Sequence, residues 1–519
     1  MRLPPDSHIE LHSNAVDTKS RGGRGHRGGE TVIFNRNLGA VCKGFSEEIP
    51  FFGIGCLLFV VNESGCCQLF KMKHRGREIV MLQKFSAGII ASGLVALLLK
   101  VVGMHPIGLE KAQQLAWQNM PLFALQKDPD PAAEAIMRQS LKAWSTKGAA
   151  VAQGVWIQSG LTILANHQGT VPLPAASLTK IATTLAALDK WGPAHQFETV
   201  VSATGPVKDG VLQGDLVITG SGDPFFVWEE AIALGNSLNQ LGIRRVTGNL
   251  VIGNGFYMNY EVNPTTAGQL PLQALNSSIW TPEILGQYSA LPPKTPKPQV
   301  AIAGGVKVAT IPIPKKFLLL RHHSLPLAQI LKEMNIYSNN EMAEILTITL
   351  GGPQERSKLA AKSAGVSLDE IQLVNGSGLG VENRISPHAV CAMFIAVDRF
   401  LQPYQLGVDD IFPVAGLDHR GTMQARKLPI GTAIKTGTLN NVSALAGKMP
   451  TRDRGEVWFA IINRGDDVEG FRVQQDQLLG RLSQQWGTSP TLNASTNQVP
   501  PLLGDPKRNE KISGIQTQL

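Results

Sequence analysis

Ser177-Leu-Thr-Lys180 is the only Ser-x-x-Lys sequence in this chain of 519 residues, and Lys435-Thr-Gly437 is its only Lys-[Thr/Ser]-Gly sequence. Ser338-Asn-Asn340 lies between them, 161 residues after Ser177 and 97 residues before Lys435. A Ser-x-x-Lys sequence alone is weak evidence, because about one or two are expected by chance in a chain of this length. The three motifs in this order are a strong signal, and they decide the fold and the chemistry that we predict.

The first motif pairs a nucleophile with a base if it lies on a helix. Residues i and i+3 share one face of a helix, so Lys180 lies one turn beyond Ser177. A serine hydroxyl is a poor nucleophile until a base takes its proton, and a partly desolvated lysine loses its own proton near neutral pH. The start of a helix also favours a developing oxyanion. The alternative is an ordinary capping serine followed by a surface lysine.

Each of the other two motifs has both a structural and a chemical interpretation. Ser338-Asn-Asn-Glu341 matches a capping box, so we expect Ser338 to cap a helix while its hydroxyl also relays a proton. The third motif lies on a predicted strand, residues 432–438, where Gly437 lets a ligand approach the backbone. Lys435 and the hydroxyls of Thr436 and Thr438 suit a substrate carboxylate.

Periodicity around the motifs predicts an early strand pair, three late strands, and helices between them and at both ends. The economical architecture is one sheet closed by N- and C-terminal segments, with helices packed on it. The predicted helices cover residues 129–144, 177–189, 327–334, 338–350 and 473–486, and the predicted strands cover 148–159, 161–165, 432–435, 443–448 and 456–463.

The domain organisation follows from shifts in composition. Residues 130–196 and 321–486 form the predicted catalytic domain, and residues 197–320 form a β-rich inserted domain with many Gly and Pro. Short β-like runs at 211–219 and 245–252 support this interpretation. From Gly487 onward the polar, Pro-containing tail, 487–519, is expected to be disordered.

The pattern of charge and hydropathy in the N-terminal hundred residues indicates an exported protein. Residues 1–80, rich in Gly and Arg at 21–29, are expected to be disordered or an over-extended reading frame with Met81 as the true start. Residues 81–103 begin with a positive charge and continue with an uncharged apolar run from Phe85 to Leu99, as in a signal peptide. A membrane anchor over 85–103, held by a snorkelling Lys100, and a core helix stay open as alternatives.

Composition excludes several classes of protein. Hydrophobic residues make up 43% and charged residues 17%, so neither wholesale disorder nor a polytopic membrane protein is expected. Half of the net charge of +8 lies in residues 1–84, and the body carries only the other half, so we expect no nucleic-acid partner. Four of the five cysteines precede residue 70, which leaves Cys391 alone in the body. We therefore expect no disulfide framework there, no metal and no cofactor.

The chain resembles the D-alanyl-D-alanine carboxypeptidases and endopeptidases of the low-molecular-mass, class C penicillin-binding proteins, over roughly residues 130–486. Beyond the three motifs, the similar stretches are Gly210–Pro224, Gly242–Val251, Asn375–Leu379 with Asn383-Arg384, and Lys435–Leu439. The resemblance implies an α/β (α+β) fold: a β-lactamase/transpeptidase-like antiparallel sheet flanked by helices, with a β-rich inserted domain.

The resemblance also implies a mechanism. Ser177 attacks the carbonyl between two D-alanines with Lys180 as general base, and the leaving D-alanine is protonated through Ser338 and Lys435. Water then cleaves the acyl-enzyme. By the same resemblance, Asn340 binds the substrate peptide and Thr436 binds its terminal carboxylate. The backbone N–H groups of Ser177 and Thr438 form the oxyanion hole, and Gly437 and Thr438 are substrate-binding residues beside it.

The resemblance implies that the substrate is a peptidoglycan stem peptide ending in D-Ala-D-Ala and that β-lactams are covalent inhibitors. It also implies an exported protein that is periplasmic or membrane-anchored.

The chain departs from the family pattern at two positions: Asn375 replaces the family's usual Asp, and Gly380 replaces a polar residue. No glutamate is evident in a deacylating role near 376–380, which favours slow, trapped acylation over fast penicillin hydrolysis. A β-lactamase or esterase on the same fold, and a non-catalytic peptidoglycan-binding protein, remain the alternatives.

Overall fold

The computed structural model describes residues 73–74, 77–78, 130–146, 152–309, 313, 315–489 and 502–512. The chain divides into two compact units, Met1–Met104 and His105–Leu519. In the first unit, β1 (Lys73–His74) pairs antiparallel with β2 (Arg77–Glu78). The predicted signal or anchor, residues 81–103, and nearly all of the predicted extension, 1–80, lie outside the described residues. Within the described part of the chain, no helix has the length and apolarity needed to cross a membrane.

A five-stranded antiparallel sheet forms the centre of the second unit, with strand order β17-β18-β19-β3-β4. Segments from both ends of the unit meet where β3 pairs with β19, which confirms the predicted closure of the sheet. The five strands are β3 (Ala152–Ser159), β4 (Thr162–His167), β17 (Ala433–Leu439), β18 (Val442–Thr451) and β19 (Gly455–Arg464).

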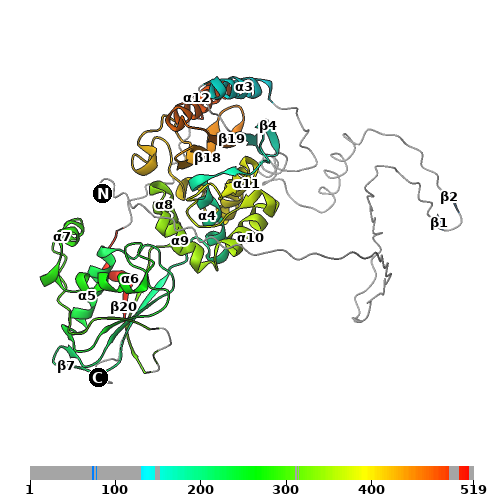
Figure 1. Cartoon of the computed structure of the whole chain (residues 1–519). Helices are drawn as coiled ribbons and strands as arrows, with labels where there is room; N and C mark the ends of the chain where they lie inside the picture. Colours follow the sequence, from blue (N-terminus) through cyan, green and yellow to red (C-terminus); the bar gives the residue numbers. More distant parts are fainter. Residues whose placement is uncertain are drawn as a thin grey trace, which may run out of the picture. The chain divides into compact units, whose positions relative to one another are not determined.

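Both faces of this sheet are covered, so the central residues of its middle strands are apolar on both faces. Alternate residues of a strand point to opposite faces. In β19, Phe459 and Ile461 pack with α3 (Pro131–Thr146) and α12 (Val468–Trp486), while Ala460 and Ile462 pack on the other side. Figure 1 shows α3 and α12 side by side over the sheet.

The second face carries a layer of helices around the site described below. The residues of α4 from Thr179 to Leu188 are all buried, so this helix is the centre of the layer. The helices α10 and α11 were not among the elements expected from periodicity. The layer contains α4 (Thr179–Trp191), α8 (Leu327–Tyr337), α9 (Asn340–Thr349), α10 (Pro353–Ala364) and α11 (Pro387–Leu401).

The region expected to be a β-rich insert has its own core, but it is mixed in structure. Its six-stranded sheet has the order β13-β11-β9-β6-β14-β20, and a second sheet has the order β12-β10-β8-β7. The strands are β6 (Glu198–Ala203), β7 (Val207–Lys208), β8 (Val211–Leu212), β9 (Leu216–Gly220), β10 (Arg245–Val246), β11 (Leu250–Ile252), β12 (Ala301–Ile302), β13 (Val306–Val308) and β14 (Phe317–His323).

Three helices that composition did not indicate pack in this region: α5 (Trp228–Gln240), α6 (Pro264–Ala274) and α7 (Pro282–Ser289). Each predicted β run is also split into two short strands that belong to different sheets. The splits fall at Gly214 and Gly248, where an added Cβ would lie within 3 Å of neighbouring atoms. Only glycine allows the backbones to approach so closely at these crossings.

The expectation of a disordered tail is wrong for residues 502–512. The strand β20 (Asn509–Lys511) pairs antiparallel with β14 and completes the six-stranded sheet. Arg508 forms an ion pair with the buried Glu230, and the Asn509 side chain donates a hydrogen bond to Ser237 Oγ over 3.0 Å. Polar residues in the tail therefore find buried partners more than 250 residues away, which local composition does not reveal.

Candidate active site

A tight turn presents Ser177 to the site. The short 3₁₀ helix η1 (Ala176–Leu178) leads directly into α4. Ala176, immediately before the serine, has a φ of 47°, in the left-handed region that residues with a side chain rarely occupy. Such strained backbone persists only where the surroundings hold it, and it is concentrated at functional sites.

Lys180 lies in the first turn of α4 with its side chain fully buried. Its Nζ lies 3.0 Å from Ser177 Oγ, 2.8 Å from Asn340 Oδ1 and 2.8 Å from the Ser377 carbonyl oxygen. The last two atoms can only accept hydrogen bonds. A neutral amine has two N–H groups, so both are used on these acceptors, and its lone pair is left for the Ser177 hydroxyl proton.

The charge state of Lys180 suits this arrangement. Burial lowers its pKa to about 7, an effect that the carboxylates of Glu344 and Glu341 oppose and the Arg356 guanidinium reinforces. An amine with a pKa near 7 is available as a base near neutral pH.

The structure corrects the expected role of Ser338 as a helix cap. Asn339 is the N-cap of α9, and its side chain accepts a hydrogen bond from Met342 N over 2.8 Å. Ser338 instead ends α8 in the left-handed conformation, with a φ of 53°. Asn is as good a cap as Ser, so the neighbouring residue takes that role. The Ser338 hydroxyl is thereby free to accept a hydrogen bond from Lys435 Nζ at 2.9 Å.

Lys435 and Gly437 lie on β17, one of the two edge strands of the five-stranded sheet. Lys435 is fully buried, and burial, with a smaller contribution from the Lys180 charge, holds its pKa well below the usual lysine value. A Cβ at Gly437 would lie 2.9 Å from the Ala175 carbonyl and 3.1 Å from Ser177 N. Glycine therefore allows β17 to lie directly against the turn that carries the serine.

The two threonines follow along the same strand. Thr436 is nearly buried, whereas Thr438 is exposed and its hydroxyl accepts a hydrogen bond from Arg472 Nη2 over 2.8 Å. Arg472 belongs to α12 and was not predicted from the sequence. This helix contains many polar residues, and no motif distinguishes one of its arginines as a binding residue. Its charge lies beside the hydroxyl expected to contact a substrate carboxylate.

The structure brings together all eight predicted site residues, along with a loop that the motifs did not include. Residues 374–380 reach Lys180 through the Ser377 carbonyl. Asn375, where an Asp was expected, braces this loop: its Oδ1 accepts from Gly378 N over 2.9 Å, and its Nδ2 donates to the Leu379 carbonyl over 2.7 Å. The departure from the family pattern therefore keeps the loop supported.

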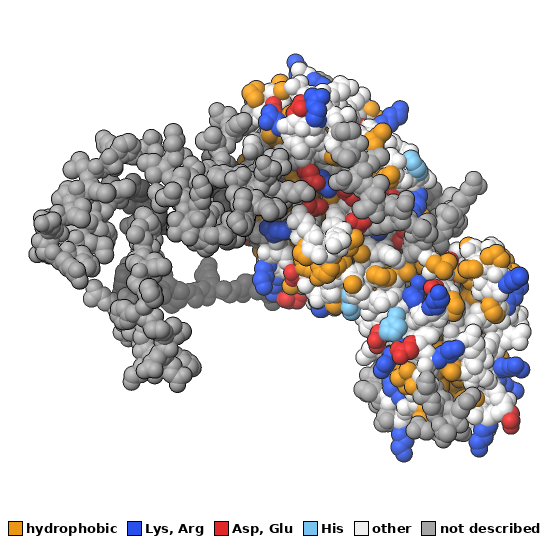
Figure 2. All heavy atoms as spheres, turned by 180° about the vertical axis from the view of Figure 1, so that it is seen from behind, with side chains coloured by type: hydrophobic (Ala, Val, Ile, Leu, Met, Phe, Trp, Pro, Cys, Tyr) orange, Lys and Arg blue, Asp and Glu red, His pale blue; other side chains and the backbone are white. Residues whose placement is uncertain are grey.

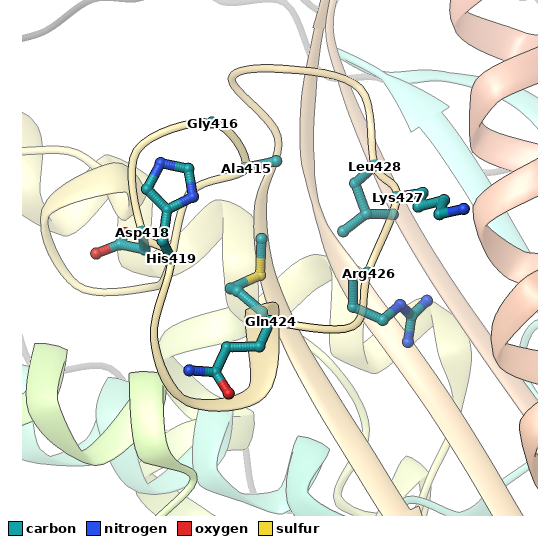
Figure 3. A pocket seen from close by; sticks show the side chains of 9 residues that line it. Ala415, Gly416, Asp418, His419, Gln424, Arg426, Lys427 and Leu428 are labelled. Carbon is teal, nitrogen blue, oxygen red and sulfur yellow. The ribbon is translucent and has the colours of Figure 1, made fainter. Parts of the chain in front are cut away.

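A separate pocket of about 300 Å³ lies in the loop from Ala415 to Leu428 and contains none of the motif residues (Figure 3). Arg426 lines it, but its guanidinium is paired with Asp476.

Among the described residues, no group of three or more His, Cys, Asp or Glu side chains could hold a metal ion. On the face in Figure 2, the basic side chains of the described part are scattered among acidic and apolar ones.

A family profile, the D-Ala-D-Ala carboxypeptidase 3 (S13) family, matches residues 138–266 and 289–485, and so spans all three motifs. The chain belongs to this family. The unmatched interval between the two stretches falls on α6 and α7 of the inserted region. All three motifs fall within the matched stretches.

Curated relatives of this family member include D-alanyl-D-alanine carboxypeptidase DacB of Haemophilus influenzae, 23% identical over 389 residues, which cover 57% of this chain and 81% of the relative. A carboxypeptidase of Mycobacterium tuberculosis is 26% identical over 365 residues, covering 60% of this chain and 75% of the relative.

Solved structures confirm the fold. The penicillin G-acylated predatory endopeptidase of Bdellovibrio bacteriovorus matches with a TM-score of 0.59 at 23% identity, covering 69% of this chain and 99% of that one. Penicillin-binding protein 4 of Haemophilus influenzae, in complex with a β-lactam, matches with a TM-score of 0.53 at 19% identity, covering 67% of this chain and 100% of that one. The predicted transpeptidase-like sheet with flanking helices is correct.

Proposed function

We propose that this family member is an exported serine D-Ala-D-Ala carboxypeptidase that trims peptidoglycan stem peptides through an acyl-enzyme. The observation that carries the proposal is the environment of Lys180 Nζ: two acceptors take its N–H groups, and Ser177 Oγ takes the remaining direction. This is the geometry of a base that removes the proton of a nucleophilic serine.

The reaction balances with the groups present. Ser177 Oγ forms a bond to the carbonyl carbon between the two D-alanines while its proton passes to Lys180. The backbone N–H groups of Ser177 and Thr438 stabilise the oxyanion. Collapse breaks the C–N bond, and the leaving amine takes a proton from the Ser338 hydroxyl, which Lys435 Nζ replaces. Water then attacks the ester carbon and the bond from that carbon to Ser177 Oγ breaks. The proton held on Lys180 returns to Ser177 Oγ, and a proton of the water restores Lys435 through Ser338.

Substrate contacts follow from the position of the remaining residues. Asn340 lies at the site through its bond to Lys180, and its amide is available to the peptide backbone. Thr436, Thr438 and the Arg472 guanidinium bind the terminal carboxylate, since a charge-assisted hydrogen bond is stronger than a neutral one. Gly437 keeps this strand close enough to Ser177 for one substrate to contact both.

Benzylpenicillin is the direct test of the nucleophile. The full chain is incubated with and without the drug, its intact mass is measured, and the adduct is located by peptide mapping. We expect one stable adduct on Ser177 and release of D-alanine from a peptide ending in D-Ala-D-Ala. Rapid turnover of penicillin without release of D-alanine would identify a β-lactamase instead. Neither adduct nor hydrolysis by a folded sample would identify a non-catalytic wall-binding protein.

Cross-linked peptides test the breadth of the activity. The resemblance covers endopeptidases as well as carboxypeptidases, so we propose that cross-links between D-Ala and meso-diaminopimelate are also cleaved. Chromatography of purified cross-linked muropeptides after digestion shows this directly. A carboxypeptidase alone shortens the stem peptides and leaves every cross-link intact.

A further inference from the structure

The loop of residues 374–380 has to be held in place for Lys180 to be oriented. One of the two acceptors that take the amine's N–H groups is the side chain of Asn340, which is fixed on a helix. The other is the Ser377 carbonyl, a backbone atom of this loop. A displacement of the loop would release one N–H of Lys180, and the lone pair would no longer be confined to the direction of Ser177.

Glu344 is the side chain that binds the loop backbone at this point. Its Oε2 accepts a hydrogen bond from Gly376 N over 2.8 Å, and its Oε1 accepts one from Ser377 N over 2.8 Å. Both carboxylate oxygens are thus used on two consecutive peptide groups. Charge-assisted bonds of this kind are about twice as strong as neutral ones.

The helix α9 therefore supplies one acceptor of the amine, Asn340, and holds the loop that carries the other. Asn340 and Glu344 are four residues apart and lie on the same face of this helix. Asn340 contacts Lys180 directly, whereas Glu344 acts through the peptide that it holds. Room for the loop against the helix is limited, since a Cβ at Gly376 would lie 2.3 Å from the Ala343 carbonyl.

A buried arginine is attracted by the Glu344 carboxylate and also supports the loop. Arg356 of α10 is fully buried, its Nη1 donates to Thr183 Oγ1 over 2.9 Å, and Thr183 in turn donates to the Gly376 carbonyl over 3.3 Å. The attraction between Arg356 and Glu344 opposes the loss of solvation of the guanidinium. The loop is therefore hydrogen-bonded on two sides: Glu344 of α9 binds the N–H groups of Gly376 and Ser377, and Thr183 of α4 binds the Gly376 carbonyl.

We propose that Glu344 is a positioning residue of this active site: through Gly376 N and Ser377 N it holds the Ser377 carbonyl on Lys180 Nζ and so orients the base toward Ser177. The inference rests on the proposed function, because it concerns the base of that reaction. It assigns Glu344 no contact with the substrate or with the reacting atoms.

Two consequences of Glu344 can be separated experimentally, one geometric and one electrostatic. The charged groups that face Lys180 are Glu344 and Glu341 from α9, Arg356 from α10 and Lys435 from β17. The Glu344 charge raises the pKa of Lys180 against the effect of burial. Its removal lowers that pKa, so the rise of the acylation rate with pH moves to lower pH. Glu341 has the same electrostatic effect, but it is exposed and forms no hydrogen bond with residues 374–380.

The experiment measures the second-order rate constant of acylation by a fluorescent penicillin between pH 5 and 9, with the full chain. We expect Glu344→Gln to lower the high-pH plateau by about 10-fold or more, since small misplacements of a catalytic group are costly, and to move the rise to lower pH. The control Glu341→Gln should move the rise in the same direction and leave the plateau unchanged.

A second variant covers the case in which Glu344→Gln does not fold. Glu344→Asp keeps the charge but is too short to bind both N–H groups, so the rise should stay near its wild-type pH while the plateau falls. A folded Glu344→Gln or Glu344→Asp protein with the wild-type plateau overturns the inference. Absence of acylation in the wild-type chain would instead refute the proposed function, and the two failures are therefore distinguishable.

Discussion

Lys435 Nζ lies 2.9 Å from Ser338 Oγ, although 97 residues separate the two in the sequence. The lysine is on β17, an edge strand of the sheet, and the serine is at the junction of α8 and α9. Lys435 also donates to the Thr436 carbonyl over 2.9 Å, so its position does not depend on the serine alone. This contact joins the second and third motifs, and in the mechanism that we propose it carries a proton.

Removal of the Ser338 hydroxyl should therefore interrupt that proton transfer. We expect Ser338→Ala to reduce release of D-alanine by about 10²-fold or more, the usual effect of losing an acid or base. The protein should remain folded, because Asn339 and not Ser338 caps α9. Activity assays with a matched thermal melt check both statements, and full activity of the variant would exclude Ser338 from proton transfer.

Ser177→Ala should abolish covalent labelling by penicillin, because no acyl-enzyme forms without the nucleophilic hydroxyl. The substitution removes one partly buried oxygen and should leave the fold intact. Intact-mass analysis after incubation with benzylpenicillin gives the answer. Labelling that persists on another serine would contradict the mechanism.

The acylation rate should depend on the protonation of Lys180. Burial lowers the pKa of this group to about 7, and only the neutral amine is a base, so the rate should rise as the pH increases through about 7. Lys180→Ala should lower the rate by about 10²-fold or more and remove this rise. The rate constant of acylation, measured at several pH values, tests both. An unchanged rate in the variant would show that Lys180 has a structural role only.

Arg472 should matter for substrates that end in a free carboxylate. We expect Arg472→Gln to raise KM for a peptide ending in D-Ala-D-Ala by about 10-fold, and to have little effect on the same peptide with a C-terminal amide. Arg481→Gln is the matched control, since Arg481 lies on the same helix and its side chain contacts Gln139 instead. Equal effects on the two peptides would show that Arg472 does not recognise the carboxylate.

The C-terminal segment should contribute to stability. Arg508→Ala leaves the buried Glu230 without its ion-pair partner, which costs about 3–5 kcal/mol for a buried pair. Lys507→Ala, at an exposed neighbouring position, should change the melting temperature little. Thermal unfolding of the full-length variants checks this. Equal melting temperatures would mean that residues 502–512 are not held by this pair.

Local pattern was enough for the central part of the fold. The strands β3, β4, β18 and β19 and the helices α3, α4 and α12 were expected within a few residues, because continuous apolar runs and helical spacing reflect burial directly. The pattern failed where glycines divide one apolar run between two sheets, as at Gly214 and Gly248. It also failed at the Ser338 cap, where two neighbouring residues were equally good candidates.

The sequence by itself determined the family and was enough to predict the chemistry, since Ser177, Lys180, Ser338 and Lys435 occur in motifs whose order and residue types are informative without coordinates. Only the tertiary structure decided what surrounds them. The Ser377 carbonyl, Glu344 and Arg472 approach the site from separate elements, and a backbone acceptor or a carboxylate on a helix has no sequence signature. The tail strand β20 is the same kind of case, because its partners are distant buried side chains whose contribution depends on where the folded chain places them.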